Sequence, residues 1–210
     1  MKAILAIGGA VIKTAWEEVK AAVEGDKVEM LIHNGASIFH DFQRATDKLL
    51  SELGRHSYPL SDLLEDKDLD RKASEMVWAW IRGEIEAPEG SLTRICEKKK
   101  INVLCFTALG CDFWQLFDPD WESFARRTKK DFYYLCQRMI EGNFHYILLG
   151  SAVIHPEVFA KAIAITRPTD FKADVVDFLE MYRPKTRVAC YGNYHKMEFK
   201  EYLRKWIQEK

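Results

Sequence analysis

The chain has 210 residues, of which 31 are basic and 32 are acidic. Compact domains commonly reach about 200 residues, so this length favours a single domain with one core. The balanced charge gives no sign of a nucleic-acid or membrane-surface partner, and no apolar stretch approaches the roughly 20 residues that cross a bilayer. We therefore expect a cytoplasmic protein that binds a small molecule, with neither nucleic acid nor membrane as a partner.

The five cysteines are scattered along the chain. No two of them have the two-residue spacing of a zinc knuckle or a redox motif, which favours structural thiols in a reducing compartment. Cys111 differs from the others because it lies between Gly110 and Asp112 in a predicted loop. Its reactivity depends on a lowered pKa.

Five short apolar segments are each followed by sequence of helical character. The predicted strands are residues 3–7, 28–32, 102–106, 146–149 and 187–190, and the predicted helices are residues 13–23, 38–53, 123–141, 156–165 and 196–208. The first apolar run ends at Gly8 and charged helical sequence follows, which predicts a buried strand rather than a signal peptide. The alternation predicts a Rossmann-like α/β fold, with a parallel sheet and helices on both faces.

Residues 54–90 interrupt this alternation. They contain a charged segment, residues 64–72, and a Trp-rich segment, residues 76–81. We interpret the charges as solvated surface and the Trp-rich part as a helix packed on the sheet or on another subunit. The prediction is one α/β domain over residues 1–210, with a charged and Trp-rich helical insert at about residues 54–90.

Four of the predicted strand-to-helix junctions consist of small residues, at positions 7–10, 33–37, 107–112 and 149–157. In a parallel sheet such junctions gather at the carboxyl edge, where ligands bind. Small residues there let a ligand approach the N–H groups that open a helix. The alternative is that small residues only turn a strand into a helix under tight packing. None of the four spells the G-x-G-x-x-G or P-loop motif.

Polar side chains accompany these turns. His40 and Asp41 follow the second turn, and His155 and Glu157 lie in the fourth. A carboxylate that orients an imidazole favours proton transfer, although neighbouring helical residues point about 100 degrees apart. The alternative for Asp41 is a residue near a helix N-terminus that the helix dipole favours. No ligand spacing among these residues and His33 requires a metal, and none is expected.

Several segments resemble the deoxyhypusine synthase-like family. Residues 34–42, Asn-Gly-Ala-Ser-Ile-Phe-His-Asp-Phe, are similar to its T-G-[AG]-N-x-x-H-D stretch, and residues 99–103 with 110–112 look like its I-P-V strand and glycine-aspartate loop. Residues 150–159 and 182–184 resemble its G-S-A-V-x-x-P-E-V-F and Y-R-P segments. The order and approximate spacing match over most of the chain.

The resemblance implies a nucleotide-binding fold shared with deoxyhypusine synthase and sirtuins, and NAD bound along the glycine turns. It also implies a homo-oligomer, a dimer or tetramer with sites between subunits. The family's enzyme uses NAD to oxidise spermidine and transfers the butylamine group through an imine on a lysine. The cofactor contacts that the resemblance implies are at Gly8, Gly9, Asn34, Gly35, Ala36, Asp112, Gly150 and Ser151.

The chain departs from the family at several places, two of which concern residues with a chemical role. The W-G-K segment that carries the imine-forming lysine is not found, and nothing in the sequence marks Lys161 or Lys196 as a nucleophile. A His-His segment expected near the end is represented by Tyr194, His195 and Lys196. His195 is either a remnant of a site or a surface residue.

The expectation is therefore a shortened, divergent bacterial homologue rather than an authentic deoxyhypusine synthase. It binds NAD or a related adenine nucleotide and acts, as a transferase-like enzyme, on a small amine or polar substrate. The alternative is a non-catalytic ligand-binding or assembly protein that keeps only the fold. The candidate catalytic residues are His40, Asp41, His155 and Glu157.

Overall fold

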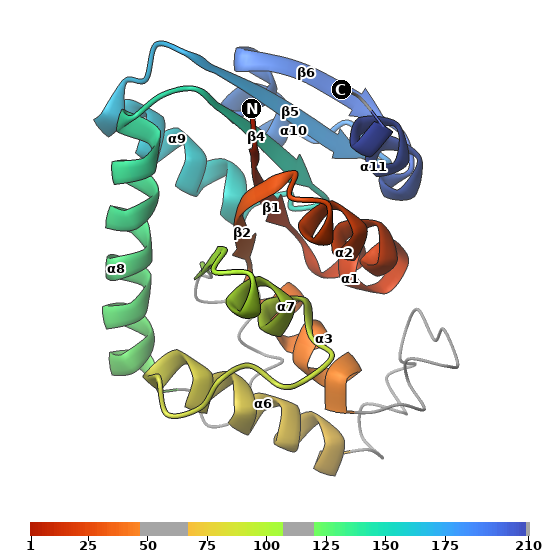
Figure 1. Cartoon of the computed structure of the whole chain (residues 1–210). Coiled ribbons are helices and arrows are strands. Elements are labelled where there is room, and N and C mark those ends of the chain that lie inside the picture. The colour runs from red at the N-terminus through yellow and green to blue at the C-terminus, as the bar shows by residue number, and fades with distance from the viewer. Residues whose placement is uncertain (47–66, 107–119, 209–210) are drawn as a thin grey trace.

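The computed structural model describes residues 1–46, 67–106 and 120–208. The described residues form one six-stranded, fully parallel sheet in the order β3-β2-β1-β4-β5-β6. Figure 1 shows this sheet running through the molecule with helices on both sides. The predicted Rossmann-like α/β class is confirmed. The strands are β1 (Ala3–Ile7), β2 (Val28–His33), β3 (Asn102–Cys105), β4 (Phe144–Leu149), β5 (Phe171–Asp177) and β6 (Gly192–Lys196).

Two groups of helices bury the two faces of the sheet. The first contributes side chains to one core cluster and consists of α1 (Gly9–Thr14), α2 (Trp16–Glu24), α3 (Gly35–Thr46), α6 (Lys67–Arg82), α7 (Leu92–Lys98) and α11 (Phe199–Gln208). The second lies over the other core cluster and consists mainly of α8 (Trp121–Ile140) and α9 (Ile154–Thr166), followed by α10 (Tyr182–Arg187) and the 3-10 turn η2 (Ala189–Tyr191). Among the described helices, none is long and apolar enough to cross a membrane.

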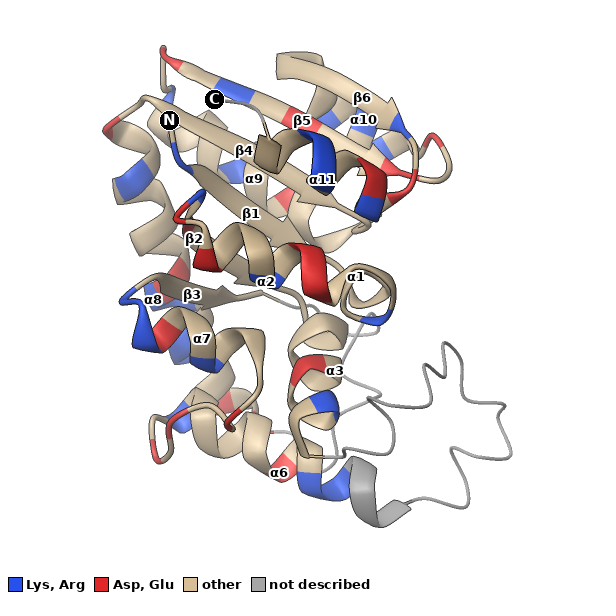
Figure 2. Cartoon of the chain, turned by 45° about the vertical axis from the view of Figure 1, so that its right-hand side comes forward, with Lys and Arg blue, Asp and Glu red and all other residues tan. Residues whose placement is uncertain are grey.

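Strand β1 is buried on both faces. Ala3, Leu5 and Ile7 pack in one core cluster, while Ile4 and Ala6 pack in the other. A continuous apolar run of this kind is typical of a central strand in a parallel sheet. The prediction of a buried first strand is confirmed. The distribution of charge agrees with this burial. Strands β1, β3 and β4 carry no charged residue, and Figure 2 shows charged residues on the helices that surround the sheet.

The β5–β6 side of the sheet differs from the prediction. The predicted strand at residues 187–190 is wrong, because these residues end α10 and enter η2, where Val188 packs into the core. Strand β5 escapes sequence recognition because Lys172 and Asp174 interrupt its apolar run. Strand β6 does so because it is an edge strand with one large apolar residue, Tyr194, among five. The last helix accordingly begins at Phe199 and not at 196.

The Trp-rich segment forms α6 and packs within this chain. Trp78 and Trp80 are buried, and the Trp80 ring meets Phe42 of α3 edge-on, with 5.9 Å between ring centroids. The helical interpretation of this segment is therefore confirmed. Helix α7 was not predicted from the sequence, although Ser91 supplies an N-cap signal and its hydroxyl accepts the Arg94 N–H.

Candidate functional site

Three of the four predicted turns meet at the carboxyl edge of the sheet. Gly8 follows β1, Asn34 follows β2 and Gly150 follows β4. The ends of these strands are in register, since Ile7 pairs with both His33 and Leu149. The remaining turn, residues 107–112 after β3, includes Asp112 and lies outside the described residues.

The strand order reverses between β1 and β4. Strands β2 and β3 follow on one side of β1, and β4, β5 and β6 follow on its other side. Strand β1 leads to α1 on one face, and the neighbouring β4 leads to α9 on the other. In open parallel sheets a crevice forms outside the strands at this switch point, and ligands bind there. Gly8, Gly9, Gly150 and Ser151 lie at this switch point.

The glycines at this crevice are also required by packing. A Cβ on Gly8 would lie 2.0 Å from the carbonyl oxygen of Gly150, and one on Gly9 would lie 2.9 Å from Cβ of Ala36. Gly150 has a φ of +59°, and its Cβ position is 2.6 Å from the Phe199 ring. The packing alternative thus accounts for glycine at these three positions. It does so whether or not a ligand is bound.

The turn after β2 caps its own helix. The Asn34 side-chain oxygen accepts the Ser37 N–H at 2.8 Å, and the Ser37 hydroxyl accepts the Asn34 N–H at 2.9 Å. This reciprocal pair is the arrangement of a capping box. Gly35 is buried and Ala36 packs against Gly9. The sequence predicted that the N–H groups at the start of this helix could bind a ligand. The Ser37 N–H is instead hydrogen-bonded to Asn34 of the same chain.

Asp41 holds the start of α7. Its carboxylate accepts the backbone N–H groups of Leu92 (2.8 Å) and Thr93 (3.0 Å), the Thr93 hydroxyl (2.8 Å) and the Trp16 indole N–H (3.4 Å). Burial raises the pKa of Asp41, and the hydrogen bonds from Thr93 and Leu92 oppose that shift. Asp41 does stabilise a helix N-terminus, as one alternative held. The helix is α7, which lies about fifty residues further along the chain, and not the helix that contains Asp41.

His33 connects this carboxylate to the turn. Its Nδ1 lies 3.0 Å from the Ser37 hydroxyl and its Nε2 lies 3.3 Å from the Thr93 hydroxyl. Because Thr93 gives its single hydroxyl proton to Asp41, His33 must donate from Nε2 and accept at Nδ1. Burial lowers the pKa of His33 to about 3, so it stays neutral.

His40 lies next to Asp41 in sequence, yet it has a different partner. Its Nδ1 is 3.2 Å from the side-chain oxygen of Gln43. Burial, followed by the charge of Lys13, lowers the pKa of His40 to about 4. His40 is thus bound to Gln43, whereas Asp41 is bound to Trp16, Leu92 and Thr93, so the two side chains serve separate contacts.

His155 and Glu157 lie at the start of α9 but serve different contacts. The His155 ring donates from Nε2 to the carbonyl oxygen of Ile7 at 3.0 Å, which ties α9 to the end of β1. Its Nδ1 is buried and has no partner in the described part of the chain, and burial lowers its pKa to about 4. Glu157 forms ion pairs with Arg183 (3.3 Å) and Arg187 (3.7 Å) of α10.

His195 belongs to a cluster beneath α11, among β4, β5 and β6. Asp174 of β5 accepts His195 Nε2 at 3.2 Å, His145 Nε2 at 2.7 Å and the Tyr202 hydroxyl at 3.1 Å. Burial acts to raise the pKa of Asp174, but the hydrogen bonds from His145 and Asn193 outweigh it and hold the pKa well below its usual value. His195 is thus a half-buried structural partner. Among the described residues, no group of three or more His, Cys, Asp or Glu side chains is arranged to hold a metal ion.

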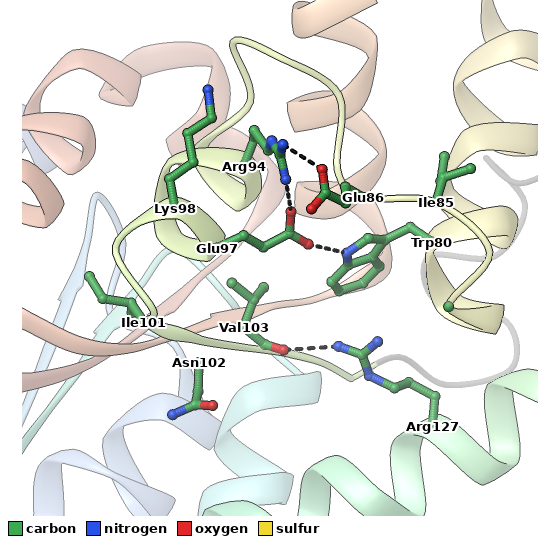
Figure 3. Close-up of a pocket in the computed structure, with 11 residues that line it drawn as sticks. Trp80, Ile85, Glu86, Arg94, Glu97, Lys98, Ile101, Asn102, Val103 and Arg127 are labelled. Carbon is green, nitrogen blue, oxygen red and sulfur yellow. Dashed lines mark hydrogen bonds and ion pairs between the residues drawn. The ribbon is translucent and has the colours of Figure 1, made fainter.

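A cavity of about 570 Å³ lies elsewhere, between α6, α7, β3 and α8. Figure 3 shows that its charged walls pair with one another: Glu97 accepts the Trp80 indole N–H at 2.8 Å and pairs with Arg94 at 3.3 Å. The Arg127 guanidinium stacks on Trp80 at 4.3 Å and donates to the Val103 carbonyl at 3.0 Å. These partnered charges leave the cavity without a group preorganised for a ligand, so the carboxyl edge remains the candidate site.

Sequence reasoning missed two residues at that edge. Thr93 joins Asp41 to His33, and no local signal could reveal it because its partners lie 52 and 60 positions away. Lys13 lies one helical turn after Gly9 and is half-buried. Burial lowers its pKa, a property that emerges only when α1 packs against α3.

Comparisons with known proteins support the fold. No family model matches the chain, and no curated protein matches it in sequence. Among solved structures, the ternary complex of AgrE with ornithine and NAD⁺ aligns with a TM-score of 0.64 and 13% identity over 99% of this chain and 29% of AgrE. The chain therefore spans less than a third of the length of AgrE.

Two further structures show the same fold. A conserved protein of Methanococcus maripaludis S2 that is named for the LOR/SDH class aligns with a TM-score of 0.64 and 12% identity, over 99% of this chain and 61% of its own. A protein of Entamoeba histolytica assigned as a deoxyhypusine synthase aligns with a TM-score of 0.54 and 10% identity, over 98% of this chain and 73% of its own. At these identities the resemblance to deoxyhypusine synthase holds at the level of the fold.

Proposed function

We propose that this chain binds NAD or a related adenine nucleotide in the crevice outside β1 and β4. The observation that carries the proposal is the reversal of strand order at this point, with Gly8 and Gly150 at the two strand exits. A ligand in such a crevice meets backbone rather than side chains, which suits the pyrophosphate of a dinucleotide. The AgrE complex, a fold neighbour, contains NAD⁺.

The same geometry argues against two of the sequence-based catalytic assignments. Asp41 is fully buried and accepts four hydrogen bonds, and Glu157 is neutralised by two arginines. A free carboxylate for a cationic amine substrate is therefore not supplied by these two residues. His155 remains a candidate, because its Nδ1 has an unused lone pair in the described part of the chain.

Nucleotide binding is tested directly by calorimetry and by thermal denaturation with NAD⁺, NADH, ADP-ribose and ATP. A ligand at 100 times its Kd stabilises the folded state by about 2.7 kcal/mol, which gives a clear rise in melting temperature. Ala152→Trp places a large ring in the turn beside Ser151 and should abolish binding. Ala164→Trp, at an exposed position near the far end of α9, is the matched control and should bind like the parent. If none of the four nucleotides binds at millimolar concentration, the proposal is wrong.

A second candidate, a nucleotide-binding protein without chemistry, is favoured by the saturated hydrogen bonds of Asp41. The two candidates differ in one measurement. An enzyme that oxidises a small amine forms NADH when the protein is incubated with NAD⁺ and spermidine or a shorter diamine, and NADH is followed by its absorbance. Binding of NAD⁺ without NADH formation from any of these amines selects the non-catalytic candidate.

A further inference from the structure

Lys13 is a half-buried cation beside the proposed nucleotide site. It lies in the last turn of α1, and in the described part of the chain no carboxylate forms an ion pair with it. Other lysines of the chain are paired, such as Lys20 with Glu24 and Lys99 with Asp26. A partly desolvated ammonium without a counter-ion is costly, and an anionic ligand would remove that cost.

The position of Lys13 is fixed by the contact between α1 and α3, which Figure 2 shows next to each other. Gly9 packs against Ala36, and the His40 ring lies 3.3 Å from the Cβ position of Gly9. Lys13 and His40 each follow this contact by one helical turn, and the charge of Lys13 acts on His40. Gly9 and Ala36 lie at the starts of α1 and α3, which follow β1 and β2, so Lys13 lies one helical turn from the exits of these two strands.

Within residues 34–46, which follow β2 in the described structure, no carboxylate is available for a ligand. In doubly wound dinucleotide sites, an acidic residue there binds the ribose 2′-hydroxyl of NAD, whereas a nearby basic residue accommodates the 2′-phosphate of NADP. Between His33 and Thr46 the single acidic residue is Asp41. Its oxygens are fully buried and already bound by α7 and Trp16.

We infer that Lys13 binds a phosphate monoester on the adenosine ribose, so that the site prefers nucleotides with a 2′-phosphate, such as NADP, over NAD. This inference rests on the proposed function. A phosphate monoester carries a charge of about −1.5 to −2 at pH 7, and its charge-assisted hydrogen bond with an ammonium is about twice as strong as a neutral one. The His40 ring is neutral and the turn 34–37 is uncharged, so among these described residues Lys13 carries the charge that makes this selection.

The experiment compares pairs of ligands that differ by the 2′-phosphate alone. Titration calorimetry measures the Kd of NADP⁺ against NAD⁺ and of 2′,5′-ADP against 5′-ADP, at low ionic strength and pH 7.5. The parent protein should bind the 2′-phosphorylated member of each pair about tenfold more tightly. Lys13→Gln should bring both ratios to about one, and Lys13→Arg should keep a preference. Lys20→Gln, on the neighbouring helix α2, should leave both ratios as in the parent.

The outcomes separate the inference from the function on which it rests. Binding of NAD⁺ as tightly as NADP⁺ by the parent overturns the inference and leaves the proposed function intact. A preference for NADP⁺ that survives Lys13→Gln overturns the role of Lys13. Binding of none of the four ligands overturns both proposals. Circular dichroism melts of each variant, compared with the parent, establish that the affinities belong to folded protein.

Discussion

Asp41 shows how one carboxylate can join distant parts of a chain. It lies in the middle of α3, and its four donors come from α2 and from the first turn of α7. All four partners are donors, which matches the acceptor-only chemistry of an ionised carboxylate. The residue that looked like half of a catalytic pair therefore stabilises the packing of α7 and α2 against α3.

We expect Asp41→Asn to lower the free energy of unfolding by about 3 kcal/mol, because one amide oxygen cannot satisfy four buried donors. Urea denaturation measures the change, and hydrogen exchange should show the largest loss of protection in α7. Glu17→Gln is the control, since Glu17 forms an exposed ion pair with Arg44 at 3.6 Å and should change stability by less than 0.5 kcal/mol, as surface substitutions usually do. A stable Asp41→Asn protein that loses nucleotide binding would instead place Asp41 in the ligand site.

At the scale of elements, hydrogen bonds connect the carboxyl ends of β1 and β4. The Gly8 N–H donates to the Leu149 carbonyl at 2.9 Å, and the His155 ring reaches the Ile7 carbonyl from α9. Gly8 itself has an extended backbone, with φ of −90°, which any residue can adopt. The need for glycine at this position is therefore steric and comes from the close approach of Gly150.

Gly8→Ala should destabilise the protein by about 2–3 kcal/mol, since its methyl group would overlap the Gly150 carbonyl and force the two strand exits apart. Gly90→Ala is the matched control. Gly90 has open space around its Cβ position but a φ of +88°, so the cost is only the backbone strain, about 1 kcal/mol. Chemical denaturation of both variants compares these costs, and a Gly8→Ala protein as stable as the control would show that the two turns separate easily.

The strands that could be predicted are those whose sequence is a nearly continuous apolar run. Strands β1, β2, β3 and β4 carry the apolar runs that a doubly covered sheet demands, and all four were predicted with nearly the observed bounds. Strand β5 places Asp174 inward, where hydrogen bonds from β4, β6 and α11 satisfy it. That inward carboxylate is acceptable only because of its partners, and these are not adjacent in the sequence.

Across the whole molecule, three buried neutral histidines link stability to pH. Burial lowers the pKa of His33 to about 3 and those of His40 and His155 to about 4. In the unfolded chain each returns to about 6.5. Below that pH the unfolded state binds the extra protons, so the stability that the neutral histidines contribute is present above about pH 6.5 and is lost as the pH falls towards 4.

Each such histidine should reduce the free energy of unfolding by about 1.4 kcal/mol per pH unit between about pH 6 and 4.5. Burial also raises the pKa of Asp41, and its protonation in the folded state opposes this loss. The comparison of the parent with His40→Gln isolates one histidine, and the slope of stability against pH should fall by about 1.4 kcal/mol per unit. Urea denaturation at several pH values measures the slopes, and equal slopes would mean that His40 is charged in the fold.

The homo-oligomer that the family resemblance implies stays a prediction. Phe178, Leu179, Met181 and Tyr182, which follow β5, are exposed in the single chain. Light scattering coupled to size-exclusion chromatography measures the molar mass against the 24.4 kDa of one chain.

The sequence by itself determined the class of the fold and predicted that the small-residue turns gather at the carboxyl edge of the sheet. Apolar strand runs, helical spacing and small-residue turns are local patterns, and the period of each is set by backbone geometry. Only the tertiary structure decided the role of each polar residue. The donors of Asp41, the arginines of Glu157 and the lack of an ion pair for Lys13 among the described residues depend on which helices meet across the sheet. Desolvation and hydrogen bonding act between neighbours in space, so a residue's chemistry is fixed only when its neighbours are.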